Sequence, residues 1–238
     1  MTGKVLEAHA AGNLYVAFQP IVDFERRDVL GYEALARCKG VIFKDTLALI
    51  DEALATGCMG ELGRELRTMA VRSGPRAGLF LNLHPNEFNE GWLVRPDDPM
   101  FFHGEPVYLE ITESVPLSHY EHCHGVLEEI RGRGISLVID DLGVGYSNLK
   151  YIADLSPKVV KLDRQLIANL RRESRLHKLV TSLVKLCDAL GAKVVAEGIE
   201  TIEELRAVID TGASYGQGYL LARPAFPAPM VDWKAIDL

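Results

Sequence analysis

Short apolar runs alternate with longer amphipathic segments along most of this chain, and this alternation limits the folds that it can adopt. The apolar runs lie at residues 16–21, 78–83, 107–111, 136–139, 159–162, 193–196 and 214–221. Apolar residues recur at helical spacing between several of these runs, at residues 46–72, 119–133, 164–190 and 202–211. Nearly continuous apolar strands separated by amphipathic helices predict a parallel sheet whose outer face is covered by helices.

The number of these units predicts a barrel. Seven or eight strand-and-helix units within 238 residues match the size of a (β/α)8 barrel, which often forms one domain. Gly134 and Gly191 each follow a helical segment and precede a strand, as glycines at helix C-termini do. A doubly wound open sheet is the main alternative, but no G-x-G-x-x-G motif follows the first strand. We therefore expect a single α/β barrel domain over residues 1–238.

The composition argues against several classes of partner and location. Hydrophobic residues make up 48% of the chain, charged residues make up 25%, and the net charge is −7. No long basic run is present, so we expect no nucleic-acid polymer as a partner. No stretch approaches the roughly 18 apolar residues of a membrane span, and the N-terminus lacks the apolar core of a secretory signal. The cysteines form no C-x-x-C pair; they are Cys38, Cys58, Cys123 and Cys187. These features predict a cytoplasmic protein with reduced thiols and no membrane partner.

Polar side chains stand at the ends of nearly all the apolar runs. They are Asn82, Glu110, Asp140 with Asp141, Lys161, Glu197 and Gln217, and Glu33 lies just past the first run and its turn. The carboxyl ends of the strands in a parallel barrel open on one face, so these side chains would converge there. Ionised groups at such positions are costly unless they are solvated, paired or bound to metal. The pattern therefore predicts a functional site at this face of the barrel.

The oxygen donors of this set predict a site for divalent cations. The donors are the side chains of Glu33, Asn82, Glu110, Asp140 and Asp141. Four carboxylates and one amide oxygen suit Mg²⁺ or Mn²⁺ better than zinc. Two metals roughly 3.5–4 Å apart need a bridging carboxylate, so Asp140 would bridge while Asp141 reaches the second ion. Such a pair of ions activates water for attack on a phosphodiester, and Lys161 and Glu197 would orient that water or take its proton.

Each residue also has an interpretation without catalytic function. A lone aspartate at a strand end is more often a turn or helix cap than a ligand. Lys161 can be an ordinary ion-pair partner, and Asn82 can form an Asx turn ahead of Pro85. What argues for function is the joint pattern, because accidental polar residues would not fall one per strand end.

Eight sequence motifs occur in a fixed order from about residue 15 to residue 224. They read FQPIVD, EALAR, LNLHP, LEITES, IDDLGVGYSNL, VVKLDRQLI, VVAEGIE and YGQGYLLARP. Together they resemble the EAL-domain family, named after a triplet that stands here as Glu33-Ala34-Leu35, whose members are cyclic di-GMP phosphodiesterases. The resemblance implies a modified TIM-type (β/α)8 barrel in which the first strand runs antiparallel to the others, with a core over about residues 14–226.

The resemblance also implies roles for individual residues. Glu33, Asn82, Glu110 and Asp140 correspond to ligands of one metal, and Asp140 and Asp141, with Glu197 close by, correspond to ligands of the other. Lys161 resembles the lysine that positions the attacking water, and Glu197 resembles the proposed general base, so Glu33, Lys161 and Glu197 form the implied catalytic set. Glu113 resembles the residue that holds the loop after the paired aspartates. The positions that contact substrate or complete the site correspond to Gln19, Arg37, Glu200 and Gln217.

The implied reaction is hydrolysis of one 3′–5′ phosphodiester of cyclic di-GMP to linear pGpG. The implied cofactors are two divalent cations, Mg²⁺ or Mn²⁺, with Ca²⁺ as an inhibitor. A homodimer and a sensor or GGDEF domain outside this chain are the implied partners. The chain departs from the family pattern after Arg37, where Cys38 replaces a common aromatic residue and the connection to Thr46 is short, which changes the local wall of the substrate site.

Two other functions compete with this interpretation. A catalytically silent receptor of the same fold would bind cyclic di-GMP without cutting it, but such a protein is expected to lack a metal or catalytic group, and none is missing here. A barrel enzyme that enolises a carboxylic acid would use Lys161 as its base. That alternative explains neither the paired aspartates nor Gln19 and Gln217.

Overall fold

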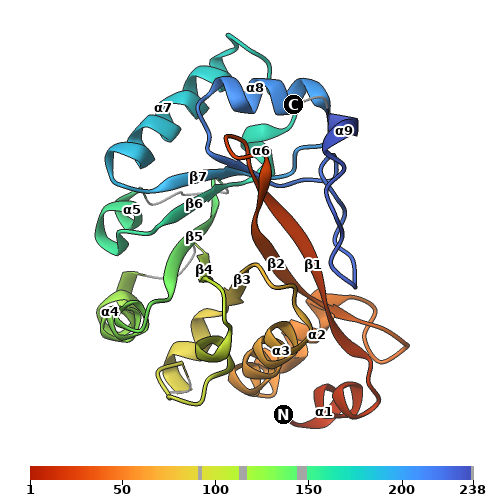
Figure 1. Cartoon of the computed structure of the whole chain (residues 1–238). Helices are drawn as coiled ribbons and strands as arrows, with labels where there is room; N and C mark the ends of the chain where they lie inside the picture. The colour runs from red at the N-terminus through yellow and green to blue at the C-terminus, as the bar shows by residue number, and fades with distance from the viewer. Residues whose placement is uncertain (91–92, 113–116, 144–148, 237–238) are drawn as a thin grey trace.

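Eight strands close into a barrel in the computed structural model, which describes residues 1–90, 93–112, 117–143 and 149–236 (Figure 1). The strands are β1 (Leu14–Asp23), β2 (Asp28–Cys38), β3 (Gly78–Leu83), β4 (Val107–Thr112), β5 (Ser136–Leu142), β6 (Val159–Leu162), β7 (Lys193–Ala196) and β8 (Tyr215–Gly216). Their order around the barrel follows their order in the chain, and β8 closes against β1. The predicted α/β barrel is confirmed, and the open sheet is excluded.

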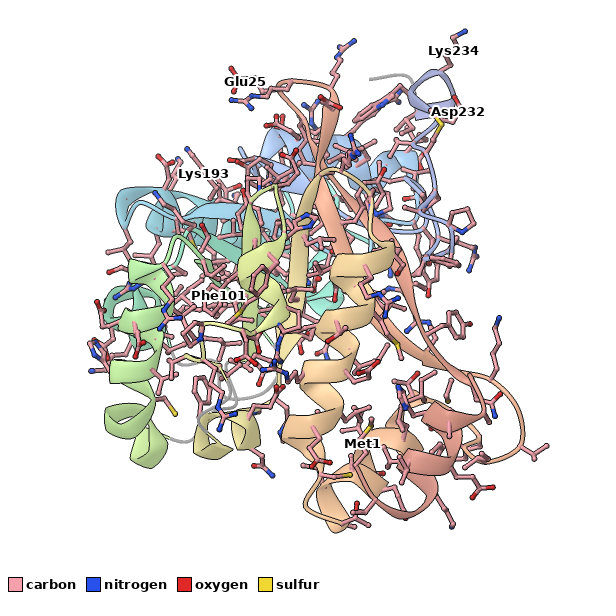
Figure 2. All side chains as sticks on the ribbon, turned by 60° about the horizontal axis from the view of Figure 1, so that its bottom comes forward. Met1, Glu25, Phe101, Lys193, Asp232 and Lys234 are labelled. Carbon is pink, nitrogen blue, oxygen red and sulfur yellow. The ribbon has the colours of Figure 1, made fainter. Side chains whose placement is uncertain are left out.

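Strand β1 runs against the rest of the barrel. It pairs antiparallel with both of its neighbours, β2 and β8, whereas the pairs from β2–β3 through β7–β8 are parallel. The turn between β1 and β2 is tight because the Asp23 carboxylate accepts hydrogen bonds from the backbone N–H groups of Glu25 and Arg26. Figure 2 shows this long hairpin with Glu25 at its tip. The antiparallel first strand implied by the resemblance is thus confirmed.

Strand β2 does not appear among the apolar runs of the sequence. It is one of the least buried strands of the barrel, and its burial alternates only weakly, so it lacks the continuous apolar signature of its neighbours. In the hairpin register Glu33 lies opposite Gln19, and on the other side it lies beside Phe80 of β3. The sequence therefore places Glu33 beyond a turn, whereas the structure places it inside a barrel strand.

Helices cover the outside of the sheet. They are α1 (Gly3–Ala10), α2 (Thr46–Ala55), α3 (Met59–Ser73), α4 (Leu117–Gly132), α5 (Lys150–Leu155), α6 (Arg164–Ile167), α7 (Arg175–Ala189), α8 (Ile202–Asp210) and α9 (Trp233–Ile236), with 3₁₀ turns η1 (Pro85–Glu90) and η2 (Pro99–Phe102). Two expected helical segments are broken. Residues 46–72 divide at Gly57, whose φ is 66°, and residues 164–190 divide where Asn169 and Glu173 adopt φ of 58° and 63°. Among the described helices, none combines the length and the apolar character that crossing a bilayer requires.

The barrel interior consists of layers, and the lower layer is apolar. Ile21, Phe80, Val138, Val159 and Val195 form a separate buried cluster. Side chains two positions apart on a strand point to the same face, so the residues that follow each of these by two positions form the next layer towards the carboxyl ends of the parallel strands. On β3, β5, β6 and β7 those positions belong to polar residues: Asn82, Asp140, Lys161 and Glu197. The apolar layer therefore forms the floor of a polar site.

Candidate metal centre

Lys161 lies at the centre of the polar layer and is 1% exposed. Its Nζ lies 2.7 Å from Glu197 Oε1 and 2.9 Å from Glu110 Oε1. It also lies 3.2 Å from Asp140 Oδ1 and 3.4 Å from Glu33 Oε2. Side chains from β2, β4, β5 and β6 and from the end of β7 thus converge at one point, as the spacing of the polar residues predicts for all of them except Glu33, which lies inside β2.

Two amide side chains donate hydrogen bonds to the Glu33 carboxylate, and a third amide contacts one of them. Asn82 Nδ2 donates a hydrogen bond to Glu33 Oε1 at 3.1 Å, and Gln217 Nε2 donates one to Glu33 Oε2 at 2.7 Å. Gln217 Nε2 also lies 3.2 Å from Gln19 Oε1, and Gln19 Nε2 donates to the carbonyl of Ala222 at 3.1 Å. Gln19 and Gln217 are both buried within the barrel; Gln217 holds Glu33 directly, and Gln19 acts on it only through Gln217. Because Asn82 uses its nitrogen for Glu33, its amide oxygen is the atom that a cation would take.

A bulge brings the second of the paired aspartates into the site. Strict alternation would direct Asp140 and Asp141 to opposite faces of β5. The β5–β6 register shifts between Ile139 and Leu142, and Asp141 adopts a left-handed φ of 59°. Bulges of this kind redirect side chains, and aspartate tolerates the left-handed region better than most residues. Ligand oxygens of Asp140, Asp141 and Glu197 consequently lie within 4.8 Å of one another.

Burial and like charge shift the pKa values of these carboxyl groups. Burial, with the charges of Asp140 and Glu33 adding to it, raises the pKa of Glu197 to about 8 despite the opposing Lys161. Burial and the neighbouring Asp140 raise the pKa of Asp141 to about 6, and burial holds that of Glu110 well above its ordinary value. Burial also acts against ionisation of Glu33, but Lys161 and the hydrogen bonds from Gln217 and Asn82 outweigh it and lower the pKa.

The described side chains fit divalent cations. Glu110 Oε1, Glu110 Oε2 and Asp140 Oδ1 are buried and accept no well-aligned hydrogen bond from the residues that the structure describes, although Lys161 lies near two of these atoms. Buried acceptors without donors are costly, and a cation supplies what they lack. The donors are all hard oxygens, as Mg²⁺ and Mn²⁺ prefer, and carboxyl groups outnumber the single ammonium in this described cluster.

A hollow of about 220 Å³ opens beside the acidic cluster. Three of the four residues matched to substrate contact line it: Gln19, Glu200 and Gln217. Asp163, Arg164 and Tyr219 also line it, and Arg164 Nη2 lies 2.8 Å from Glu200 Oε2. Sequence reasoning assigned no role to these three. A signal was available, since Asp163 and Arg164 follow the apolar run of β6 directly, in the same position as the other strand-end residues.

Arg37 lies apart from the other residues matched to substrate contact. It lines a second cavity of about 520 Å³, which Asn82, His84 and Thr112 also border and which extends between β2, β3 and helices α2 and α3. Its Nη1 donates to the carbonyl of Ala36 at 2.8 Å. Asn82 is thus the residue that joins this cavity to the acidic cluster. Glu113, matched to the loop-holding position, lies outside the described residues.

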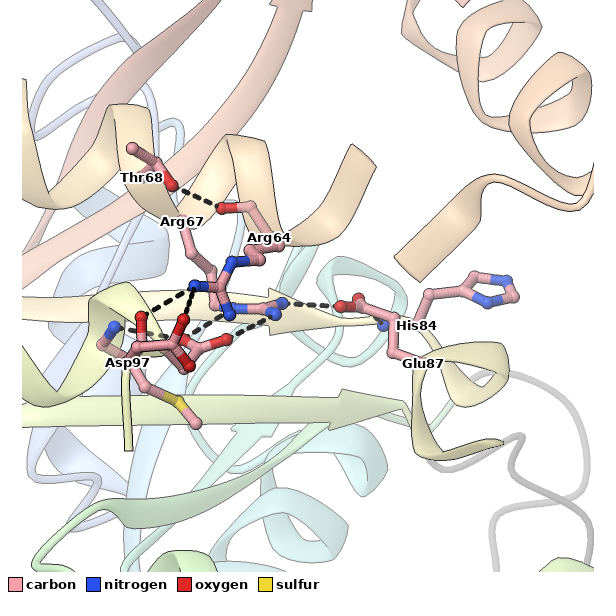
Figure 3. Close-up of polar contacts among 8 residues, drawn as sticks. Arg64, Arg67, Thr68, His84, Glu87 and Asp97 are labelled. Atoms are coloured by element: carbon pink, nitrogen blue, oxygen red, sulfur yellow. Dashed lines mark hydrogen bonds and ion pairs between the residues drawn. The ribbon is translucent and has the colours of Figure 1, made fainter. Parts of the chain in front are cut away.

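A buried ion-pair network supports the loop that follows Asn82 (Figure 3). Arg67 of α3 lies 2.6 Å from Glu87 Oε2 and 3.0 Å from Asp98 Oδ2, and all three side chains are at most 2% exposed. Glu87 Oε1 also accepts a hydrogen bond at 3.0 Å from the backbone N–H of His84, two residues after Asn82. The network therefore ties α3 to the carboxyl end of β3, and no sequence motif pointed to it.

The fold and the site together define a class: a TIM-type barrel with one antiparallel strand and an oxygen-rich acidic cluster at its mouth. The family model of the EAL domain matches residues 3–224. The chain belongs to the EAL-domain family, as its motifs indicate.

Several curated proteins are similar to this chain. The cyclic di-GMP phosphodiesterase RocR of Pseudomonas aeruginosa is 31% identical over 241 residues, covering 93% of this chain and 60% of RocR. The probable cyclic di-GMP phosphodiesterase PdeI of Escherichia coli is 30% identical, covering 93% of this chain and 30% of PdeI. The chain therefore spans less than two thirds of the length of these curated relatives.

Solved structures agree with this family assignment. The PaMucR phosphodiesterase in complex with c-di-GMP superposes with a TM-score of 0.78 at 29% identity, covering 90% of this chain and 97% of that one. The Klebsiella pneumoniae BlrP1 complex with calcium and cyclic di-GMP gives a TM-score of 0.77 at 28% identity, covering 90% of this chain and 56% of that one. BlrP1 has also been solved with manganese and cyclic di-GMP.

Proposed function

We propose that this EAL domain hydrolyses one 3′–5′ phosphodiester of cyclic di-GMP to give linear pGpG, with two divalent cations as cofactors. The observation that carries the proposal is the convergence of Glu33, Glu110, Asp140 and Glu197 on Lys161, in a chain whose relatives bear the name cyclic di-GMP phosphodiesterase. The proposal is supported by the charge of the cluster: its carboxyl groups outnumber the Lys161 ammonium, so bound cations would offset the excess negative charge.

Each cation would be held by oxygen donors from different strands. The ligands of the first would be Glu33, Asn82, Glu110 and Asp140, and those of the second would be Asp140 and Asp141 with Glu197 beside them. When bound, such cations supply Lewis acidity, which lowers the pKa of water and offsets charge on a phosphodiester. Ligand type does not separate Mg²⁺ from Mn²⁺, so both belong to the proposal.

The protein's own groups would carry the proton transfers. Glu197, whose Oε1 lies 2.7 Å from Lys161 Nζ, would accept a proton from the attacking water. Lys161 would hold that water and pair with a phosphate oxygen as negative charge builds up. The water oxygen bonds to phosphorus, the bond from phosphorus to the 3′ oxygen breaks, and the 3′ oxygen gains a proton from solvent. The hydrogen bonds from Asn82 and Gln217 keep Glu33 oriented throughout.

The substrate would span the mouth of the barrel. The hollow lined by Gln19, Glu200 and Gln217 is open to solvent beside the cluster, and Arg37 at the second cavity provides a separate positive charge. A dinucleotide carries two phosphates and two bases, so it can contact both regions at once.

Turnover of cyclic di-GMP tests the proposal directly. We expect the purified domain to convert cyclic di-GMP to pGpG with Mg²⁺ or Mn²⁺, as measured by chromatography, and to stop when EDTA is added. Ca²⁺ should bind without supporting turnover, since it does not demand the short, near-octahedral coordination of Mg²⁺. Tight binding of the dinucleotide with no pGpG at saturating Mn²⁺ would refute hydrolysis and favour the receptor. Absence of both binding and turnover would refute the choice of substrate.

The proposal extends to the cellular location and the partners of the domain. The described cysteines are unpaired, which suits the reducing cytosol in which we place the reaction. The chain spans 33% of the bifunctional diguanylate cyclase/cyclic di-GMP phosphodiesterase MucR, so a GGDEF or sensor domain is a partner that we propose. A homodimer is a further proposal, which size-exclusion chromatography with light scattering would test.

A further inference from the structure

Two loops at the barrel mouth meet at a single carboxylate. Glu204, the third residue of α8, is buried at 8% exposure. Its Oε2 accepts hydrogen bonds from the backbone N–H groups of Glu200 at 2.9 Å and Thr201 at 3.1 Å. Its Oε1 accepts a hydrogen bond at 2.8 Å from the backbone N–H of Asn169, which lies after α6 and is 35 residues away in sequence. Both oxygens of Glu204 are therefore in use, one towards each loop.

Only one side of this arrangement is needed to cap the helix. Thr201 and Glu204 form a capping box, in which Thr201 Oγ1 accepts from Glu204 N–H and Glu204 Oε2 accepts from Thr201 N–H. The bond to Asn169 adds nothing to the cap. It joins the loop after β6 to the loop after β7, and Asn169 meets it from a left-handed backbone with φ of 58°. Burial acts to raise the pKa of Glu204, but these donors outweigh it and lower the pKa, so the group is an ionised acceptor.

The two joined connections carry groups that line the 220 Å³ hollow and contact each other. Asp163 and Arg164 lie at the start of the first connection, where α6 begins, and Glu200 lies on the second, with Arg164 Nη2 2.8 Å from Glu200 Oε2. Lys161 and Glu197 depend less on this link, because strand pairing already fixes them: Glu197 N–H donates to the Leu162 carbonyl at 3.0 Å. In Figure 1, α6 lies beside α8, as the hydrogen bond from Asn169 to Glu204 requires.

We propose that Glu204 is a positioning residue for substrate binding: it joins the loops after β6 and β7 so that Arg164 and Glu200 keep their places along the hollow. The proposal rests on the proposed function, because it concerns how this site holds the cyclic dinucleotide. A carboxylate suits the position because it only accepts hydrogen bonds and has two oxygens, one for each loop. A glutamine has one acceptor, so its NH₂ group would face one of the loop N–H groups and release that loop.

Glu204→Gln tests the proposal, with Glu203→Gln as its matched control. Glu203 is the preceding residue in the first turn of α8 and is exposed, so its variant removes the same charge without touching either loop. We expect Glu204→Gln to raise KM for cyclic di-GMP roughly tenfold, the lower end of the effect of removing an outer partner of a site. Its kcat should change much less, because Lys161 and Glu197 stay in place. Glu203→Gln should behave as wild type.

Three further measurements separate positioning from helix capping. Thr201→Ala weakens the cap but keeps the carboxylate, so it should lower Tm without the rise in KM. In an Arg164→Met background, the KM effect of Glu204→Gln should shrink, since the two residues act through one arrangement. Hydrogen exchange gives a readout that does not depend on turnover. The amides of Asn169, Glu200 and Thr201 should be protected in the wild type, and that of Asn169 or those of Glu200 and Thr201 should lose protection in Glu204→Gln.

The outcomes distinguish this inference from the function on which it rests. A wild-type domain that neither binds nor hydrolyses cyclic di-GMP would overturn both. Wild-type turnover together with an unchanged KM in Glu204→Gln would overturn the positioning role alone. Rapid exchange of the Asn169 amide in the wild type would overturn it as well, even if the variant did not fold. Equal KM changes in Thr201→Ala and Glu204→Gln would reduce Glu204 to a helix cap.

Discussion

Replacing Lys161 by methionine should destabilise the cation-free protein and make it unusually dependent on divalent metal. The substitution keeps an unbranched side chain but removes the ammonium that lies 2.7 to 3.4 Å from four carboxylates. Glu33, Glu110 and Asp140 are themselves buried, at no more than 7% exposure, so their charges cannot turn to solvent once the ammonium is gone. Breaking a buried pair by removing one partner costs about 3–5 kcal/mol, so we expect a loss of that order in the free energy of unfolding.

Binding of a divalent cation should restore most of the free energy of unfolding that Lys161→Met loses. A ligand that binds only the folded state at a concentration 100 times its Kd adds about 2.7 kcal/mol. In Lys161→Met the cation no longer competes with the ammonium for the same oxygens, so its affinity should rise. We therefore expect the variant to gain more stability from Mn²⁺ than the wild type gains, even though the variant turns over slowly.

Urea denaturation in EDTA and in MnCl₂ measures both effects. Lys158→Met is the control, because Lys158 is exposed and precedes the same strand, and it should change stability by no more than about 0.5 kcal/mol. Two results would refute the reasoning. One is a Lys161→Met protein as stable as wild type in EDTA. The other is an equal gain from Mn²⁺ in both proteins, which would mean that the ammonium and the cation do not share their oxygens.

Three further predictions address catalysis, pH and the supporting network. Glu33→Ala should abolish pGpG formation while circular dichroism shows an intact fold. The control Glu25→Ala, at the exposed hairpin tip, should keep wild-type activity. Retained turnover of Glu33→Ala at saturating Mn²⁺ would count against the role of Glu33 as a metal ligand. A carboxyl group whose pKa is raised by folding stabilises the protein at low pH, and this contribution is lost as pH rises. In EDTA, the free energy of unfolding of wild type relative to Glu197→Gln should therefore fall between the unfolded pKa near 4.5 and the folded pKa of about 8. Urea titrations that show a relative rise over this pH window would contradict the assignment. Arg67→Met should lower the free energy of unfolding by about 3–5 kcal/mol, because it leaves Glu87 and Asp98 buried without a counter-charge. Arg72→Met, on the exposed face of the same helix, should lower it by about 0.5 kcal/mol or less. Similar denaturation midpoints for the two variants would show that the network does not support α3.

The convergence of the site could be predicted from sequence because barrel topology converts strand-end positions into neighbours. Asn82, Glu110, Asp140 and Lys161 are separated along the chain, yet parallel pairing from β3 to β6 brings their side chains together. The apolar runs indicate which side chains point inward, since Asn82, Asp140 and Lys161 each stand two positions beyond a buried floor residue. The family motifs added the antiparallel first strand, which periodicity alone does not reveal.

Other features depended on tertiary contacts that leave no local pattern. Strand β2 has no continuous apolar run that would reveal it in the sequence. Its pairing with β1 in the hairpin and with β3 on the other side holds it in the barrel. The position of Asp141 depends on a bulge and a left-handed backbone, and neither shows in the letters of the sequence. Glu204 has the local signature of a capping box, but its bond to Asn169 arises only when two distant loops meet. The ion-pair network around Arg67 likewise joins α3 to segments far along the chain.

Anomalous diffraction from crystals soaked in Mn²⁺ tests the central claim most directly. We expect two manganese peaks at the carboxyl ends of the strands, one among Glu33, Asn82, Glu110 and Asp140 and one at Asp140 and Asp141. The same soak of Glu33→Ala should lose the first peak. Peaks elsewhere on the molecule, or none at this cluster while Lys161 keeps its four carboxylates, would contradict a barrel built to hold a pair of cations.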